Sequence, residues 1–376
     1  MIKVIHVIND TTVSDAGKVL LTTLRNIDRA KFDVKVVLPL GSALIPRVDA
    51  LGFEHICTKR STDKLFDIGA ISEYRKIFKA EKPDVVHTHS AVAARIAAFL
   101  SGVRVRIHTR HSLSAPRPIL TRFPFRNLYG FVNNTLSTQM VSLSETAKDN
   151  LIAMGVNPKK IAVVINGAEP LRDVTAEEAG TLRSELGIKD GDFVVGMSAR
   201  LQESKGHIYL IEAARILHER DCNNLKVLII GTGATEEHLR AKASEYGISD
   251  SVIFTGFVGD VAPYIKAMDV IVNCSIGTES TSTVLVEAMS LAKPAIATDC
   301  GENAFIIENG KNGFIIPQKS ASNLSEAIQK LMDNPLKLTE MAKFAYSKYI
   351  CRLTGKIMTG KMEKIYEDGY NQRCKK

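Results

Sequence analysis

The sequence predicts an α/β protein made of two doubly wound parallel sheets. Short apolar or β-branched segments alternate with helical patterns twice along the chain, once in each half, and such alternation is typical of parallel sheets. A polar stretch around residues 166–179, which contains Pro170, separates the two series. The 376 residues are enough for two domains of ordinary size.

In the first half, five segments are expected to form strands, and helical patterns lie between them. The expected strands are Lys3–Ile8, Phe32–Leu38, Pro83–Thr88, Val103–Thr109 and Gln139–Leu143. Examples of the expected helices are Ala16–Ile27, Ile71–Lys79 and Ala91–Leu100.

In the second half, an acidic helix start at Thr175–Glu178 comes before six expected strands. These strands are Phe193–Ser198, Lys226–Gly231, Val252–Gly256, Asp269–Cys274, Ala295–Thr298 and Gly313–Ile316. Leu338–Tyr370 has a helical pattern and no expected strand.

Composition indicates an ordinary globular protein, with 45% apolar and 24% charged residues. No apolar run of about 18 residues and no signal-peptide pattern is visible. The six cysteines have no zinc-site spacing. We therefore expect a cytoplasmic protein that can also bind peripherally to the inner face of the cell membrane.

The basic charge is confined to the first half. Residues 1–170 carry 24 Lys and Arg against 14 Asp and Glu, a balance of +10, whereas the remainder carries 25 against 27, a balance of −2. Arg104–Arg126 holds six arginines and no acid, with apolar residues between them. This segment is expected to meet an anionic membrane or a phosphorylated lipid acceptor, through Arg110, Arg117, Arg122 and Arg126. A nucleic-acid partner and a plain basic surface loop are the alternatives.

Two carboxylates and a run of hydroxyl residues follow the expected strand Asp269–Cys274. Glu279 should lie at the carboxyl end of that strand, where open α/β sheets bind ligands. A helix expected to begin over Ser280–Thr283 would offer free N–H groups to a diphosphate, and Glu287, two turns later, would hold a ribose. The alternative is two solvated glutamates.

A second site is expected after the strand Phe193–Ser198. Arg200 and Lys205 follow it, and Lys205 comes at a helix start, where the dipole disfavours a cation. An anion such as a diphosphate would balance both charges. Two ordinary surface cations are the alternative.

Together these motifs resemble the retaining glycosyltransferases of family 4, which have the two-domain GT-B fold. The resemblance covers most of the chain. Its further motifs are Met1–Ile8 with Ala16–Leu21, Pro83–Ser90, Thr109–Ser112, Ile165–Gly167, Ile229–Gly233 and Phe254–Phe257.

The resemblance implies two Rossmann-like domains that face an interdomain cleft. Residues 1–170, completed by a C-terminal helix at about 354–376 that crosses back, would bind the acceptor. Residues 171–353 would bind a nucleotide-diphosphate sugar, with a UDP-sugar as the expected donor. The acceptor would be a lipid-linked or cell-surface glycan precursor, and nucleic acid would not be a partner.

The resemblance also implies the site residues. The catalytic set is His111, Arg200, Lys205 and Glu279. The donor-binding set is Gly17, Gly231, Gly233, Phe257, Thr281, Ser282, Thr283 and Glu287. His111 follows the expected strand Val103–Thr109, at a carboxyl end.

Neither a metal nor a cofactor is expected, and the enzyme would be a hexosyl- or N-acetylhexosaminyl-transferase. Asp190 and Asp192 flank Gly191 in an expected turn, so Arg200 and Lys205 would support the leaving phosphate instead. Glu236 stands where a dinucleotide fingerprint needs its third glycine, which disfavours NAD.

One loop departs from the family pattern, because Ser14-Asp15 stands where relatives often have Gly-Gly. Asp15 is expected either to narrow the approach of a ligand or to cap the following helix. The alternatives to a transferase are a nucleotide-sugar 2-epimerase of the same fold and a catalytically silent nucleotide- or nucleic-acid-binding protein.

Overall fold

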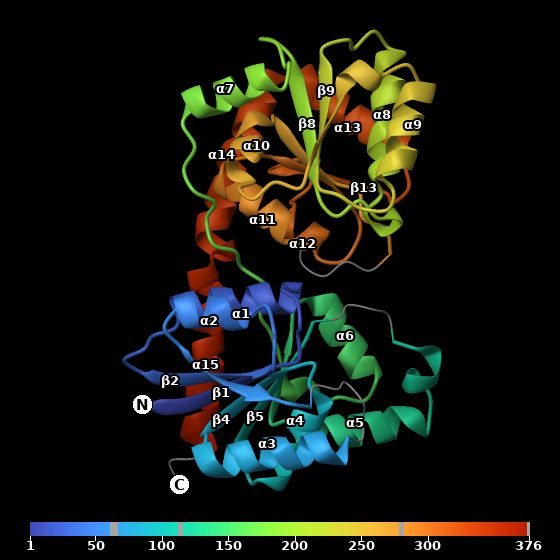
Figure 1. Ribbon diagram of the computed structural model, residues 1–376. Coiled ribbons are helices and arrows are strands. Elements are labelled where there is room, and N and C mark those ends of the chain that lie inside the picture. The colour runs from blue at the N-terminus through green and yellow to red at the C-terminus, as the bar shows by residue number, and fades with distance from the viewer. Residues whose placement is uncertain (61–66, 112–115, 278–281, 374–376) are drawn as a thin grey trace. The chain divides into compact units, whose positions relative to one another are not determined.

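The computed structural model describes residues 1–60, 67–111, 116–277 and 282–373 (Figure 1). Contacts between residues divide the chain into two compact units. Unit 1 consists of Met1–Ala168 and Gly355–Lys376, and unit 2 consists of Glu169–Thr354.

Unit 1 is built on a parallel seven-stranded sheet with the order β3-β2-β1-β4-β5-β6-β7. The strands are β1 Ile2–Ile8, β2 Phe32–Pro39, β3 Glu54–Thr58, β4 Val85–His89, β5 Val105–Arg110, β6 Gln139–Ser142 and β7 Ile161–Val163. The strand order reverses between β1 and β4, and the carboxyl ends of strands at such a point border a ligand crevice in open α/β sheets.

Helices cover both faces of this sheet (Figure 1). They are α1 Asp15–Asn26, α2 Ile45–Ala50, α3 Ile68–Glu81, α4 Val92–Leu100, α5 Phe125–Leu136, α6 Glu145–Ala153 and α15 Gly355–Arg373, with 3₁₀ turns η1 Pro118–Thr121 and η2 Pro158–Lys160. One apolar core joins α1, α2 and α15 to the sheet, and a second joins α3 and α4 to its other face.

Unit 2 repeats the same plan with six parallel strands in the order β10-β9-β8-β11-β12-β13. The strands are β8 Phe193–Ser198, β9 Leu225–Ile230, β10 Val252–Gly256, β11 Val270–Asn273, β12 Ala295–Thr298 and β13 Gly313–Ile316. Here the order reverses between β8 and β11, so the candidate ligand crevice of this unit lies at their carboxyl ends.

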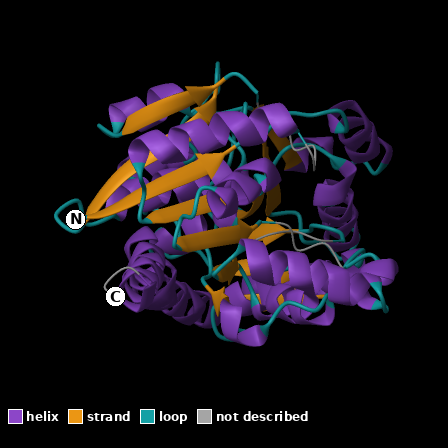
Figure 2. Ribbon diagram, turned by 90° about the horizontal axis from the view of Figure 1, so that it is seen from below, coloured by secondary structure: helices purple, strands orange, loops and turns teal. Residues whose placement is uncertain are grey.

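Helices of unit 2 also lie on both sides of its strands (Figure 1). Figure 2 shows the strands of unit 1, which carries both chain ends, between layers of helices. They are α7 Ala176–Glu185, α8 His207–His218, α9 Glu236–Glu245, α10 Ala262–Ala267, α11 Thr283–Ser290, α12 Asn303–Ile306, α13 Ala321–Met332 and α14 Pro335–Lys348. Shorter turns are η3 Glu203–Lys205, η4 Ser249–Ser251 and the π-helical η5 Tyr349–Leu353.

Both predicted parallel sheets are confirmed, as is the return of the last helix to the first unit. α15 packs on α1, and a Cβ at Gly369 would lie 2.8 Å from Val105 Cγ1 in β5. Thr175 caps α7 by accepting from the Glu178 N–H at 3.1 Å, as its acidic helix start predicted. The predicted cleft between the domains stays a prediction.

Two edge strands of unit 1, β3 and β7, were not expected. β3 reads Glu-His-Ile-Cys-Thr, and only its last residue, Thr58, is buried. An edge strand needs few apolar residues, because one side of its backbone is unpaired and its side chains are partly solvated. The hydrophobic pattern of Glu54–Thr58 therefore did not indicate a strand.

Candidate active site

Two loops meet at the point of unit 2 where the strand order reverses. One follows β8 and the other follows β11. The Ile276 N–H donates to the carbonyl oxygen of Ser204 at 2.8 Å. Gly206 has a φ of +71°, and a Cβ built there would lie 2.1 Å from the Cys274 carbonyl oxygen. Only glycine combines this backbone conformation with so close an approach.

The first of these loops carries the two predicted cations. Arg200 is exposed two residues beyond β8, and Lys205, half-buried, is the third residue of η3, just before α8. Within the described residues, the Arg200 guanidinium has no hydrogen-bond or ion-pair partner. The structure thus places both cations at the carboxyl end of β8, where a ligand anion would balance them.

The second loop leads into α11. Asn273, the last residue of β11, donates through Nδ2 to Ser282 Oγ at 2.8 Å and accepts the Ser275 N–H at 3.0 Å. This residue therefore fixes the start of α11 against the end of its strand. The N–H groups at a helix start carry a partial positive charge that favours anions. Asn273 was not predicted as a site residue, although an amide at the end of the otherwise apolar strand β11 can be seen in the sequence.

α11 spans Thr283–Ser290, with Ser282 as its N-cap residue. This start falls within the range Ser280–Thr283 over which the sequence predicted the helix to begin. Glu287 lies about 6 Å along the axis from Thr283. Glu279 and Thr281 lie outside the described residues.

Glu287 is half-buried near the π-helical turn η5. Burial raises the pKa of Tyr349, and the charges of Glu169 and Glu287 raise it further. Two carboxylates therefore lie close to this phenol. Tyr349 and Glu169 were not predicted from the sequence, because they come from the two ends of unit 2.

Gly231 and Gly233 bring the loop after β9 against the loop after β8. A Cβ on Gly231 would lie 2.1 Å from the Ala199 carbonyl oxygen, and one on Gly233 would lie 2.2 Å from that of Leu201. Backbone packing alone therefore requires both glycines. Their contact with a donor nucleotide stays a prediction.

In unit 1, His111 follows β5 and contacts a histidine of β4. Its Nε2 atom lies 2.9 Å from His89 Nδ1. Burial lowers the pKa of His111 to about 4, although the Asp15 carboxylate opposes this shift. His111 is therefore a neutral imidazole near pH 7.

The unusual Ser14-Asp15 pair begins α1. Ser14, not Asp15, is the N-cap residue, and its Oγ accepts the Gly17 N–H at 3.2 Å and donates to Asp10. The suggestion that Asp15 caps the helix is therefore wrong. A Cβ on Gly17 would lie 3.0 Å from Leu44 Cδ2, so packing of α1 against Leu44 already favours glycine there.

Two family models together cover most of the chain. Glycosyltransferase Family 4 matches residues 16–171, and Glycosyl transferases group 1 matches residues 179–348. The chain belongs to the family 4, group 1 glycosyltransferases. Its fold is the GT-B fold.

Named relatives of this glycosyltransferase cover nearly the same length. A UDP-Gal:alpha-D-GlcNAc-diphosphoundecaprenol alpha-1,3-galactosyltransferase of Escherichia coli is 27% identical over 93% of this chain and 92% of its own. A putative glycosyltransferase EpsD of Bacillus subtilis is 29% identical over 78% and 79%. The crystal structure of Anabaena Alr3699/HepE with UDP has a TM-score of 0.83 at 19% identity, covering 98% of this chain and 100% of its own.

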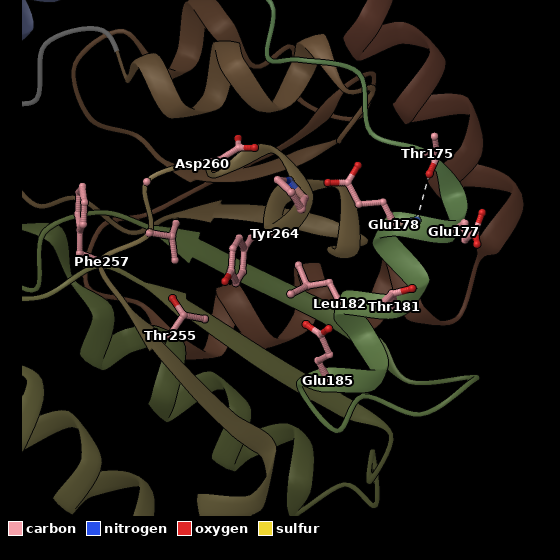
Figure 3. A pocket seen from close by; sticks show the side chains of 13 residues that line it. Thr175, Glu177, Glu178, Thr181, Leu182, Glu185, Thr255, Phe257, Asp260 and Tyr264 are labelled. Atoms are coloured by element: carbon pink, nitrogen blue, oxygen red, sulfur yellow. Dashed lines mark hydrogen bonds between the residues drawn. The ribbon is translucent and has the colours of Figure 1, made fainter.

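A groove elsewhere on unit 2 of this glycosyltransferase has the wrong charge for a diphosphate. It encloses about 790 Å³ between α7 and the loop after β10 (Figure 3). Glu177, Glu178, Glu185 and Asp260 line it, and Arg172 pairs with Glu178 and Asp260. Phe257, 80% exposed, lies at one end of this wall. Carboxylates repel phosphate, so the loops after β8 and β11 remain the better diphosphate site.

The six arginines of the glycosyltransferase's Arg104–Arg126 segment do not form one surface. Arg104 and Arg110 lie at opposite ends of β5. Arg106 donates to the carbonyl oxygens of Val103, Leu136 and Thr135 at 2.6 to 3.1 Å. The guanidinium of Arg106 is therefore used by unit 1 itself, and the length of β5 separates Arg104 from Arg110.

Three arginines of the segment remain together on the outside of unit 1. Arg117, Arg122 and Arg126 are exposed around η1 and the start of α5. The apolar side chains beside them are also exposed, namely Ile119, Phe123, Phe125, Leu128 and Phe131. We call these eight residues the α5 surface.

Proposed function

We propose that this glycosyltransferase moves a sugar from a UDP-sugar to a hydroxyl of a lipid-linked or cell-surface glycan precursor, with retention of configuration. The carrying observation is the meeting of two loops in unit 2, which brings Arg200 and Lys205 to the strand ends beside the start of α11. The names of the relatives support the substrate classes, since one uses UDP-Gal with a diphosphoundecaprenol-linked acceptor and another was crystallised with UDP.

In this proposal unit 2 holds the donor. Arg200 and Lys205 bind the diphosphate through charge-assisted hydrogen bonds. The N–H groups at Ser282 and Thr283 face the same phosphates. Glu279 accepts hydrogen bonds from hydroxyls of the transferred sugar, and Glu287 holds the ribose.

The proposal includes further donor contacts. The exposed ring of Phe257 and the backbone at Gly231 and Gly233 border the position of the base. Gly17, near the start of α1 in unit 1, is kept as a donor contact. Residues 1–170 with the last helix form the acceptor-binding domain. Residues 171–353 form the donor-binding domain.

The reaction needs support for negative charge on the leaving UDP. In this proposal Arg200 and Lys205 lie beside the phosphate, and their positive charge balances its negative charge without a metal ion. The acceptor hydroxyl attacks from the face that the leaving group departs from, and passes its proton to the departing phosphate. A neutral His111 suits hydrogen bonding to the substrate better than proton abstraction, because its pKa is about 4.

The α5 surface would bring unit 1 to anionic lipid. None of the helices in the described part of the chain combines the length and hydrophobicity needed to cross a bilayer. Arg117, Arg122 and Arg126 would attract the headgroups while Phe123, 83% exposed, and Phe131, 69% exposed, enter the interface. No acidic residue occurs between Arg104 and Ser144 to oppose this attraction. We place the enzyme at the cytoplasmic face of the membrane on this basis.

A thermal-shift screen of the full chain with UDP-, GDP- and ADP-sugars tests the donor class. A ligand that binds the folded state alone raises the melting temperature, so UDP and its sugars should raise it most. No shift with any nucleotide would contradict the proposal.

A second assay tests the reaction itself and its expected independence of metal. Transfer to a polyprenyl-diphosphate-linked sugar should be as fast in excess EDTA as with Mg²⁺. A large loss of rate that metal restores would contradict metal independence. Interconversion of UDP-N-acetylhexosamines without acceptor would instead favour a 2-epimerase.

A further inference from the structure

Six side chains of unit 1 form one continuous chain of hydrogen bonds. Thr109 Oγ1 lies 2.7 Å from His87 Nε2, and His87 Nδ1 lies 2.7 Å from the Tyr366 hydroxyl. That hydroxyl lies 3.3 Å from His6 Nε2. His6 Nδ1 lies 3.1 Å from His89 Nε2, and His89 Nδ1 lies 2.9 Å from His111 Nε2. This chain of hydrogen bonds begins at Thr109, inside the sheet, and ends at His111, which the proposed function places beside the substrate.

Every histidine of this chain is neutral near pH 7. Burial lowers the pKa of His6 to about 3 and of His111 to about 4, and it places the pKa values of His87 and His89 well below 6.5. A neutral imidazole has one N–H and one bare nitrogen. Each ring therefore donates on one side and accepts on the other, so the chain has only two consistent directions.

The buried end of the chain selects one direction. Thr109 is 1% exposed, and within the described residues its hydroxyl has no hydrogen-bond partner other than His87. If the Thr109 hydroxyl donates to His87, its proton is satisfied. If His87 donates instead, the hydroxyl proton is buried without an acceptor, which carries the desolvation penalty of an unmade hydrogen bond.

The favoured direction fixes each tautomer in turn. Thr109 donates to His87, which then carries its proton on Nδ1 and donates to Tyr366. The Tyr366 hydroxyl donates to His6 Nε2. His6 and His89 in turn donate through Nδ1, so His111 accepts at Nε2.

We propose that this chain holds His111 in the Nδ1–H tautomer, so that His111 offers its ligand a hydrogen-bond donor, and that Tyr366 is the positioning residue that links the two halves of the chain. Within the described residues, Nδ1 of His111 has no hydrogen-bond partner. The identity of that ligand, a sugar or phosphate oxygen, rests on the proposed function. The tautomer itself does not.

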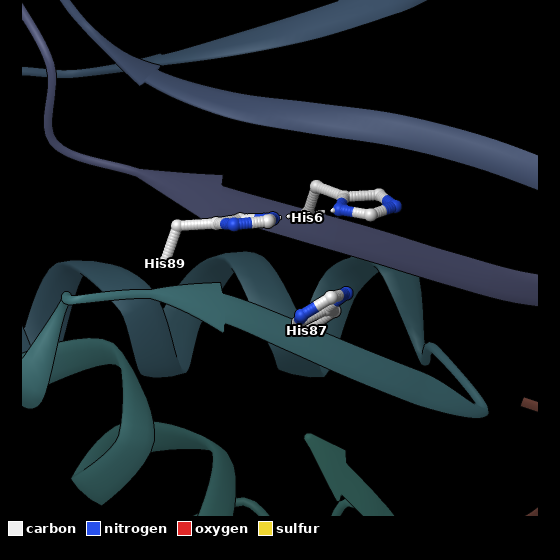
Figure 4. Close-up of side chains that lie close together, drawn as sticks. All are labelled: His6, His87 and His89. Carbon is white, nitrogen blue, oxygen red and sulfur yellow. Dashed lines mark hydrogen bonds between the residues drawn. The ribbon is translucent and has the colours of Figure 1, made fainter. Parts of the chain in front are cut away.

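A bound metal ion is the competing explanation for three of these rings. Nitrogen atoms of His6, His87 and His89 lie within 4.8 Å of one another (Figure 4). A metal ion would need a lone pair from each ring. The hydrogen-bonded chain already uses both nitrogens of all three rings, so the hydrogen-bond geometry favours the chain.

Long-range ¹H–¹⁵N spectra of the ¹⁵N-labelled full chain test the proposal directly, because protonated and bare ring nitrogens differ widely in shift. Single His→Gln variants assign the signals. The expected result is Nδ1–H at His6, His87, His89 and His111 at pH 7.5, with mixed tautomers at the exposed His238 as a reference. Nε2–H at His111 would overturn the proposal. The measurement needs no activity, so a protein that transfers no sugar still tests it.

A matched pair of variants on α15 tests whether Tyr366 connects the two halves of the chain of hydrogen bonds. Tyr366→Phe keeps the ring but removes the hydroxyl, so the ring shifts of His6, His89 and His111 should move toward mixed tautomers. Tyr370→Phe removes a hydroxyl from the same helix outside the chain and should leave them unchanged. Unchanged His111 shifts in folded Tyr366→Phe would overturn the role of Tyr366. Zinc binding at one equivalent that His6→Gln abolishes would overturn the chain in favour of a metal site.

Discussion

The Ile276 N–H donates to the carbonyl oxygen of Ser204 at 2.8 Å and joins the loop after β11 to the loop that carries Arg200 and Lys205. The Cα of Gly206 faces the Cys274 carbonyl oxygen beside this bond. The two loops thus hold each other, and the protein itself fixes the backbone that carries Arg200 and Lys205. Preformed charge is what stabilises a leaving phosphate effectively.

Gly206→Ala should destabilise unit 2 far more than Gly187→Ala. Both glycines have a φ of +71°, but a Cβ at Gly187 would meet nothing within 4 Å. Gly187→Ala should therefore cost only the left-handed strain of about 1–2 kcal/mol. Gly206→Ala adds displacement of the Cys274 carbonyl, roughly 1–3 kcal/mol more. Urea unfolding measures both free energies, and equal losses would show that the two loops do not need this contact.

Stability should fall as the pH drops below about 6.5. The folded-state pKa values of His6 and His111 are about 3 and about 4, whereas an unfolded histidine titrates near 6.5. Below pH 6.5 these histidines therefore bind protons in the unfolded state but not in the folded state. Each such histidine lowers the free energy of unfolding by up to about 1.4 kcal/mol per pH unit.

Urea unfolding between pH 8 and pH 5 checks this dependence. The free energy should be nearly constant above pH 7.5 and should fall below pH 6. His111→Gln should flatten the fall, while His238→Gln, which removes an exposed ring, serves as the control. A level profile down to pH 5 would contradict neutral burial of these rings.

Glu287→Ala should raise the donor KM more than it lowers kcat. A ribose contact is made equally in the ground state and the transition state, so its loss weakens binding without slowing the bound complex. Hydrogen bonds to a charged group contribute about 1.5–3 kcal/mol, which is roughly 10- to 100-fold in KM. Steady-state kinetics measures this, with the exposed Glu326→Ala on α13 as the control. An unchanged KM with a collapsed kcat would assign Glu287 to the chemical step.

Replacing Arg117, Arg122 and Arg126 with Gln should weaken binding to anionic vesicles. Each basic residue near such a surface contributes about 1 kcal/mol, so three should change partitioning by roughly 10²-fold at low salt. Donor binding should not change. Co-sedimentation with anionic and neutral vesicles measures the effect.

The matched control for the membrane experiment removes the same charge from another part of unit 1. Lys356, Lys361 and Lys364 are exposed on α15, and their triple Gln variant should keep most of the binding. If both triple variants lose binding equally, net charge rather than the α5 surface attracts the protein. Binding that ignores lipid charge and salt would make a water-soluble acceptor the better proposal.

The sequence predicted what depends on continuous patterns. Buried parallel strands such as β8 and β11 are apolar except at their last residues, and the residues that follow them are brought to one edge by the topology alone. Arg200 and Lys205 could be placed for that reason. The polar edge strand β3 gave no such pattern.

The chain of hydrogen-bonded side chains in unit 1 could not be predicted in the same way. His6, His87, His111 and Tyr366 come from β1, β4, the end of β5 and α15. Alternation along β4 indicated that His87 and His89 share a face. Nothing local to the sequence indicated that a tyrosine of the last helix lies between His87 and His6.

Isothermal titration of UDP into the full chain is the measurement that tests the central claim most directly. The claim is that Arg200 and Lys205 hold the diphosphate of the donor. Each charge-assisted contact is worth about 1.5–3 kcal/mol, so Arg200→Ala and Lys205→Ala should each weaken UDP by roughly 10- to 100-fold. Lys189→Ala, an exposed cation before the start of β8, should bind UDP like the unaltered protein. Unaltered UDP affinity in both Arg200→Ala and Lys205→Ala would contradict the account, because the donor site would then lie elsewhere.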